Sequence, residues 1–201
     1  MKFLFENSYH IYNRGNNKNN IFFNSENYFY FIYKIRKHLL PHCSILAYCL
    51  MPNHFHFLIF VDRNIGGTDS NRATDHPISK GLRILLSSYS QAINIQQKRT
   101  GNLFQQNTKI KCISDILCDN ISNNYYDYIC FNYIHQNPLK AKLVQRIEDW
   151  EFSSFRDYIG LRKGTLCNLN LAFNIITNLE KENLYKMSYE SLTEEDVNKI
   201  F

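Results

Sequence analysis

Residues 44–61 read SILAYCLMPNHFHFLIFV, and this stretch decides the fold. It contains two apolar runs, residues 44–50 and 54–61, which are rich in β-branched and aromatic side chains. The short turn at residues 51–53, with its proline and asparagine, separates them. This pattern is typical of two antiparallel strands joined as a hairpin.

The second of these runs carries two histidines at alternate positions. Successive side chains on a strand point to opposite faces, so His54 and His56 share one face. The opposite face holds apolar side chains that can pack beneath helices: Phe55, Phe57, Ile59 and Val61. Two neighbouring imidazoles are a natural pair of metal ligands, but two ordinary sheet histidines fit the same spacing.

Working outward from the hairpin, hydrophobic periodicity and turn signals give the remaining elements. The patterns predict a strand over residues 8–14, a helix over 26–40, strands over 44–50 and 54–61, a helix over 79–98, a strand over 108–113 and a helix over 119–137. The first six form a ferredoxin-like βαββαβ unit, an α+β fold with two helices on one face of an antiparallel sheet. Its first and third strands lie centrally, and the helix 119–137 is an addition to it.

Local signals set the expected ends of these helices. Ser25 stands where it can cap the helix 26–40. We expect Pro138 to end the helix 119–137, because the residue before a proline is pushed out of helical geometry. Beyond it, WEFSSFRDY at residues 150–158 looks like a docking strap, and residues 168–201 look helical.

Composition narrows the class of protein. The chain has 201 residues, of which 44% are hydrophobic and 20% charged, so it can bury a real core and is not a disordered protein. No apolar run reaches the roughly 18 residues of a membrane span. The six cysteines form no CxxC pair, which favours buried free thiols in a reducing compartment. We therefore expect a soluble cytoplasmic protein.

Charge is unevenly distributed along the chain. The net charge is +5, but residues 180–201 contain six acidic and three basic side chains, so that they carry −3 and residues 1–179 carry +8. A positive body with an acidic tail suits a polyanionic partner. The same distribution is common in ordinary proteins, so charge alone does not identify the partner.

The late helix offers candidates for a nucleophile and a third metal ligand. Tyr133 and Asn137 are four residues apart and so share one helical face. Asn137 has a carbonyl oxygen suited to magnesium or manganese, and Tyr133 has a phenol that can form a covalent intermediate. A packed aromatic and a helix C-terminal residue are the structural alternatives. Tyr89 is a rival nucleophile, although its apolar neighbours favour a core position.

Four segments together resemble a known family. They are YHIYNRGNN near the N-terminus, AYCLMPNHFHFLIF, the late YIHQNPLKAKLV, and WEFSSFRDYIG. In this order they look like a REP-associated tyrosine transposase, a branch of the single-tyrosine HUH transposases. HUH denotes histidine, a hydrophobic residue and histidine, here His54, Phe55 and His56. The resemblance covers roughly residues 7–160 and implies a transposase domain over residues 1–160, with residues 161–201 as a helical tail of unknown role.

The resemblance implies a role for each matching residue. His54 and His56 match the metal ligands, Tyr133 matches the catalytic tyrosine, and Asn137 matches the asparagine that completes the metal site. The implied cofactor is a divalent metal, Mg²⁺ or Mn²⁺. The implied reaction is cleavage and rejoining of single-stranded DNA through a 5′-phosphotyrosine link. Phe104, where the family usually has tryptophan, and Gln106 or Asn107, where it usually has arginine, depart from the pattern.

The implied partner is single-stranded DNA with hairpin or palindromic repeats, bound by a monomer or homodimer that is associated with the nucleoid when on DNA. Candidate cations for backbone contacts are Arg14, Lys18, Lys34, Lys98, Arg99, Lys109 and Lys111. Three other classes remain as alternatives: an inactive DNA-binding relative, a replication or relaxase-like nuclease, and a structural zinc protein. An amide oxygen with two histidines is a poor structural zinc set.

Overall fold

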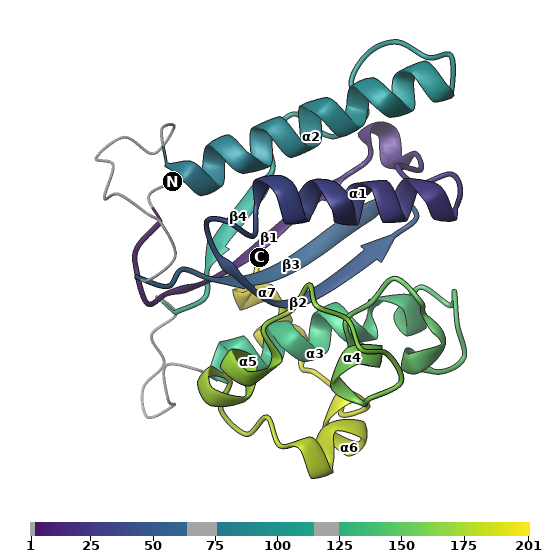
Figure 1. The fold of residues 1–201 in the computed structure, drawn as a ribbon. Helices are drawn as coiled ribbons and strands as arrows, with labels where there is room; N and C mark the ends of the chain where they lie inside the picture. Colours follow the sequence, from purple (N-terminus) through teal and green to yellow (C-terminus); the bar gives the residue numbers. More distant parts are fainter. Residues whose placement is uncertain (1–2, 64–75, 115–124) are drawn as a thin grey trace.

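The computed structural model describes residues 3–63, 76–114 and 125–201. Four antiparallel strands form one sheet in the order β2-β3-β1-β4 (Figure 1). The strands are β1 (Ser8–Arg14), β2 (Ser44–Met51), β3 (His54–Phe60) and β4 (Lys109–Cys112). The first and third strands are central, as predicted, and the chain has the predicted ferredoxin-like α+β fold.

Two helices cover one face of the sheet, α1 (Ser25–His38) and α2 (Pro77–Gln96) (Figure 1). The buried cluster between them and the sheet includes Phe55 and Phe57 of β3, Phe31 of α1 and Tyr89 of α2. Tyr89 is fully buried and donates a hydrogen bond to the Ile21 carbonyl at 2.7 Å. The alternation predicted for β3 is therefore confirmed, and Tyr89 belongs to the core.

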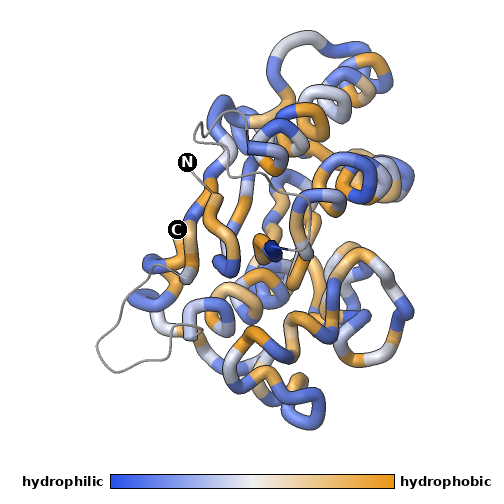
Figure 2. Tube along the Cα trace, turned by 60° about the vertical axis from the view of Figure 1, so that its left-hand side comes forward, coloured by the Kyte–Doolittle hydropathy of each residue, from blue (hydrophilic) through white to orange (hydrophobic). Residues whose placement is uncertain are grey.

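The opposite face is covered by helix α3 (Tyr125–Lys140), which packs against β2 and β3 (Figure 1). Four shorter helices complete this layer: α4 (Phe155–Tyr158), α5 (Leu169–Ile175), α6 (Leu184–Ser188) and α7 (Glu194–Lys199). Three 3-10 turns lie at Asn16–Lys18, Ile147–Asp149 and Lys181–Asn183. Strands β2 and β3 are largely hydrophobic, whereas the outer turns carry much of the hydrophilic sequence (Figure 2). The face of β3 that bears His54 and His56 thus lies toward α3.

Several predicted boundaries need correction. Helix α1 is capped by Asn24, not Ser25, because the Asn24 side chain accepts a hydrogen bond from the Asn27 backbone N–H. Helix α2 begins at Pro77, two residues before the predicted start, since proline is favourable at a first helical position. Helix α3 continues through Pro138 to Lys140, so the prediction that Pro138 ends it was wrong. A proline this close to a helix end removes a single backbone hydrogen bond.

Residues 150–158 pack on the sheet and residues 168–201 are largely helical, as their sequences predict. Residues 150–158 dock along β2, where the Trp150 indole donates to the Leu50 carbonyl at 3.0 Å and Ser153 forms a bridge with Cys49. The tail is helical and joins the hydrophobic cluster beneath the sheet through residues such as Leu184 and Ile200. The C-terminus therefore lies against the sheet (Figure 1).

Two other expectations can be compared with the structure. Four of the described cysteines are buried free thiols, as predicted: Cys43, Cys49, Cys130 and Cys167. Cys112 is buried as well. Cys118 and the predicted start of the late helix at residue 119 lie outside the described residues. Within the described ranges, no helix combines the length and the apolar character needed to cross a membrane.

Candidate active site

A cavity of about 480 Å³ opens between the central strands and helix α3. Its wall includes His54 and His56 from β3 together with Tyr133 and Asn137 from α3. The four residues predicted from two distant segments are therefore brought together at one place. The ring centroids of His54 and His56 are 5.1 Å apart, and that of Tyr133 is 5.6 Å from that of His56. This spacing follows from the packing of α3 on the histidine face of the sheet.

A relay of hydrogen bonds fixes the orientation of His56. His10 of β1 places its Nε2 at 2.9 Å from Nδ1 of His56, and its own Nδ1 at 2.8 Å from the Ile200 carbonyl. A carbonyl can only accept, so Nδ1 of His10 carries a proton. Burial lowers the pKa of His10 to about 4, so the neutral ring has a lone pair on Nε2 and must accept from Nδ1 of His56. His56 therefore keeps a lone pair on Nε2, the form in which imidazole binds a metal.

His54 is held in the same tautomer by a different partner. Its Nδ1 lies 2.6 Å from Oδ1 of Asn53, and the Asn53 amide nitrogen donates to the Lys18 carbonyl at 3.3 Å. Because that bond fixes the amide, the Asn53 oxygen accepts from Nδ1 of His54 and leaves Nε2 of His54 with its lone pair. Burial lowers the pKa of His54 to about 4, with the Arg14 charge adding to the effect. Both imidazoles are thus neutral at pH 7.

Asn137 is oriented by its own helix. Its amide nitrogen donates to the Tyr133 carbonyl at 2.9 Å, one turn earlier. Asn137 lines the cavity beside His54 and Tyr133, where it partly offsets the effect of burial, which lowers the pKa of His54 and raises that of Tyr133. Asn137 therefore links the imidazole pair to the phenol.

The Tyr133 side chain is half-buried and contacts the rings of His10, His56 and Phe201. Burial raises the pKa of its phenol, while hydrogen bonding to Asn137 and the charge of Arg14 act in the opposite direction. The Lys140 ammonium lies 5.7 Å from its ring centroid. The phenol is consequently neutral at pH 7 and needs a nearby positive charge to become a nucleophile.

The predicted DNA-contacting cations fall into separate groups. Arg14 and Lys109 line the cavity that holds His54 and Tyr133, and Lys111 follows two residues later on β4. Lys18, Lys98 and Arg99 lie near another hollow, whose wall includes Arg99. Lys34 lies 5.1 Å from the Tyr30 ring centroid on α1, across the sheet from the cavity. The structure thus places Arg14 and Lys109 with the four predicted site residues and leaves Lys34 apart.

Two residues at the site were missed by the sequence analysis. His10 points to the same face as His56, but this follows only from the antiparallel register of β1 and β3. Phe201 lines the cavity, and its ring centroid lies 5.1 Å from that of Tyr133 and 4.9 Å from that of Tyr12. Strand alternation at His10 and Tyr12 offered a signal for the first, whereas no local pattern pointed to Phe201.

The residues present fit a divalent metal. Two imidazoles with free Nε2 lone pairs and one amide oxygen form a set of three neutral donors, with both histidines held through their second nitrogens as metal ligands usually are. In the described part of the chain, no three His, Cys, Asp or Glu residues gather into a metal-binding group. The amide oxygen is therefore the donor that would complete a three-residue site, a set that suits Mg²⁺ or Mn²⁺ better than structural zinc.

Comparison with known proteins adds one similarity. No protein-family model and no curated protein matches the chain. Among solved structures, the chain is similar to a REP-associated tyrosine transposase bound to a REP hairpin, with 18% sequence identity over 80% of this chain and 83% of that chain. The TM-score is 0.57. At this identity the similarity shows a shared fold, the ferredoxin-like fold of that transposase.

Proposed function

We propose that this protein is a metal-dependent, transposase-type endonuclease and strand transferase acting on single-stranded DNA that carries a hairpin. The observation that supports it is the meeting of Tyr133, Asn137, His54 and His56 around one cavity. All four belong to one chain, so the proposed site needs no second copy. The transposase of similar fold was solved with a REP hairpin, which supports hairpin DNA as the substrate class. Such an enzyme would act on the nucleoid in the cytoplasm.

The proposed reaction is an in-line displacement at a phosphodiester. The Tyr133 oxygen loses its proton to solvent and forms a bond to phosphorus, while the bond to the 3′ oxygen breaks and that oxygen takes up a proton. The products are a 5′-phosphotyrosine link and a free 3′-OH. Because the link keeps the phosphoester bond energy, another 3′-OH can attack it and rejoin strands without ATP.

The other residues of the cavity position and stabilise the reacting groups. His54, His56 and Asn137 would hold the divalent cation, which would supply Lewis-acid polarisation of the scissile phosphate when bound. Burial raises the pKa of Tyr133, and Arg14 partly offsets this rise and carries a charge suited to a phosphate oxygen. Lys109 offers a second cation at the cavity wall. Neutral metal ligands leave the full charge of the cation for the phosphate.

A second candidate function is a hairpin DNA-binding protein that does not cut. The observation that favours it is Phe201, whose ring packs against Tyr133, His10 and Tyr12 on the wall of the cavity. An aromatic ring at this position takes space that a scissile phosphate needs. The two functions differ in one product, the covalent protein–DNA adduct.

The test is to incubate the protein with single-stranded hairpin DNA and Mn²⁺ or Mg²⁺ and to look for a covalent adduct on a denaturing gel. Tyr133→Phe should abolish the adduct and leave DNA binding largely unchanged, since it removes a single oxygen. Tyr128→Phe is the matched control, because Tyr128 lies on the same helix and donates to Glu190 rather than facing the cavity. An undiminished adduct with Tyr133→Phe would show that another residue is the nucleophile. Hairpin binding without any adduct from the wild type would favour the second function.

A further inference from the structure

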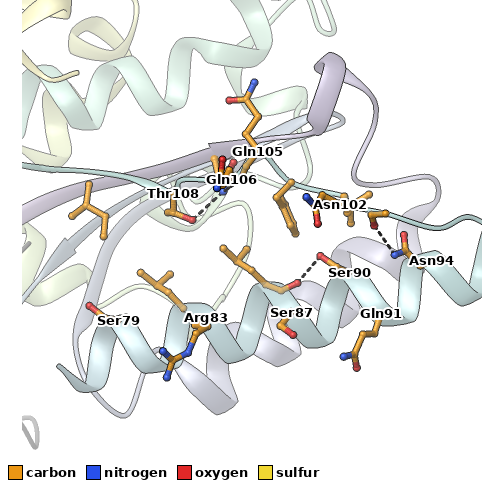
Figure 3. Close-up of a pocket in the computed structure, with 17 residues that line it drawn as sticks. Ser79, Arg83, Ser87, Ser90, Gln91, Asn94, Asn102, Gln105, Gln106 and Thr108 are labelled. Atoms are coloured by element: carbon orange, nitrogen blue, oxygen red, sulfur yellow. Dashed lines mark hydrogen bonds between the residues drawn. The ribbon is translucent and has the colours of Figure 1, made fainter. Parts of the chain in front are cut away.

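A second large cavity lies beside helix α2, near the edge of the sheet that is formed by β4. It has a volume of about 560 Å³, within the range of small-molecule sites, and lies between α2 and the segment at residues 101–110 (Figure 3). None of the predicted site residues lines it. We call it the α2 groove.

The lining of the α2 groove combines an apolar floor with a polar rim. Leu82, Leu86, Phe104 and Ile110 contribute apolar surface. Amide and hydroxyl side chains surround it: Ser87, Ser90, Gln91, Asn94, Asn102 and Gln106 (Figure 3). Arg83 is the one charged residue among the described residues that line it. This chemistry suits a flat, uncharged ring with hydrogen-bonding edges and does not suit a phosphate group.

The α2 groove adjoins the catalytic cavity across the segment at residues 105–110. Asn13 and Gln105 line both spaces. Along the segment that separates them, Asn107 and Lys109 line the catalytic cavity, whereas Gln106, Thr108 and Ile110 line the α2 groove. Lys109 and Ile110 lie on strand β4, whose successive side chains point to opposite sides, whereas residues 106 and 107 form a bend before it. A DNA strand crossing this edge would therefore meet cations on one side and amides on the other.

Hydrogen bonds hold the separating segment in place. The Gln105 backbone N–H donates to the Arg14 carbonyl at 2.8 Å, and the Asn13 amide donates to Thr108 Oγ1 at 2.9 Å. At the other end of the groove, the Asn94 amide donates to the Gly101 carbonyl at 2.9 Å (Figure 3). The rim side chains thus project from a fixed backbone, as base selection requires.

We propose that the α2 groove is a nucleobase subsite, which binds one unpaired base of the single strand whose phosphate lies in the catalytic cavity. The inference rests on the proposed function for the location of the strand. The base edge contacts amide side chains of the rim, and its faces contact the apolar floor. Amide side chains distinguish bases by paired donor and acceptor contacts, so this groove sets a sequence preference beside the cleaved bond.

The test uses the Tyr133→Phe variant, so that the experiment measures DNA binding without cleavage. Hairpin oligonucleotides carry each of the four bases in turn at every unpaired flanking position, and fluorescence anisotropy gives their affinities. A second series places 2-aminopurine at the same positions to report burial of the base. The variants are Gln91→Ala with Gln106→Ala, both at exposed side chains, and the matched control is Gln145→Ala, an exposed glutamine that lines neither cavity.

We expect one flanking position to show a base preference of about tenfold or more, together with a change in 2-aminopurine emission. The Gln91/Gln106 variant should lose that preference and that signal, and Gln145→Ala should keep both. Equal affinity for all bases at every position, or a preference that the groove variant retains, would overturn the subsite. If the wild type forms no covalent adduct but the preference exists and depends on Gln91 and Gln106, the nuclease proposal fails and the subsite stands. Absence of any DNA binding overturns both.

Discussion

At the scale of single residues, the direction of each hydrogen bond decides what the imidazoles can do. The Ile200 carbonyl accepts from His10, His10 accepts from His56, and His56 is left with a free lone pair at Nε2. His10 thereby acts as a positioning residue for a proposed metal ligand. Its contribution can be measured separately from catalysis through metal affinity.

We predict that His10→Ala lowers Mn²⁺ affinity by about 10- to 100-fold, the range found when partners of metal-bound histidines are removed. Without His10, Nδ1 of His56 has no acceptor and the ring loses its fixed tautomer. Mn²⁺ titration followed by electron paramagnetic resonance gives the affinity, with circular dichroism as the check on folding. His10→Gln should recover part of the affinity, because its amide oxygen can accept from His56. Unchanged affinity in a folded His10→Ala variant would contradict the relay.

Part of the site was predictable from residue spacing alone. Strand alternation placed His54 and His56 together, and helical periodicity placed Tyr133 with Asn137. His10 was not found, because alternation along β1 shows only that it shares a face with Tyr12, and its position beside His56 depends on the register between β1 and β3. Phe201 was missed for the same reason, since its contacts with Tyr133 depend on how the tail packs. Which side chains share a face of one strand or helix can be predicted from sequence. Contacts that depend on strand register or on the packing of distant segments cannot.

At the scale of elements, the start of α1 distinguishes two candidate caps. The Asn24 side chain accepts from the Asn27 backbone N–H at 3.0 Å, and the Asn27 side chain accepts from the Phe23 backbone N–H at 3.0 Å. These reciprocal bonds satisfy donors that a helix start otherwise leaves unpaired. The sequence analysis named Ser25 as the cap, whereas the backbone conformation of the structure places Asn24 in that position.

We predict that Asn24→Ala lowers the free energy of unfolding by about 1 kcal/mol, the usual effect of losing an N-cap. Ser25→Ala is the matched control and should change stability by a few tenths of a kcal/mol, because Ser25 is already inside the helix and alanine is a good helix former. Urea denaturation of the three proteins gives both values. A larger loss from Ser25→Ala than from Asn24→Ala would show that the helix starts one residue later.

Helix α3 shows why proline misled the sequence analysis. Pro138 lies in the last turn, where its missing N–H removes one bond and the chain continues to Lys140. The helix then closes through the Leu143 backbone N–H, which donates to the Pro138 carbonyl at 3.0 Å. Asn137 is therefore inside the helix, one turn from Tyr133, and not at a frayed end. Both side chains are held on a rigid element, as a reaction at a fixed phosphate requires.

At the scale of the whole molecule, the two faces of the sheet are packed differently. The α1 and α2 face is filled by aromatic and aliphatic side chains. The α3 face combines a second apolar cluster with the cavity that holds the imidazoles. The strand order was predictable because alternation and hairpin signals are local. The docking of α3 and the tail on the histidine face was not, since it depends on buried contacts between distant segments.

The interface between α3 and the sheet also contains a buried carboxyl group, that of Asp127. Asp127 is almost fully buried, and burial raises the pKa of its carboxyl to about 7, partly offset by the nearby Ser8 hydroxyl. A carboxyl with a raised pKa binds more protons when folded than when unfolded. The folded state therefore loses stability as pH rises from near 4, where the unfolded carboxyl titrates, toward 7.

We predict that Asp127→Asn removes this loss, because an amide of the same shape does not ionise. The difference in unfolding free energy between variant and wild type should grow in favour of the variant by a few kcal/mol between about pH 5 and pH 8, at about 1.4 kcal/mol for each unit of pKa. Urea denaturation across this range gives the difference. Asp149→Asn serves as the control of opposite sign, since hydrogen bonding to Arg146 lowers the pKa of that exposed carboxyl, and its ion pair stabilises the folded chain more as pH rises. A pH-independent difference for Asp127→Asn would mean that water reaches the carboxyl, and that α3 packs on the sheet less tightly than the described contacts require.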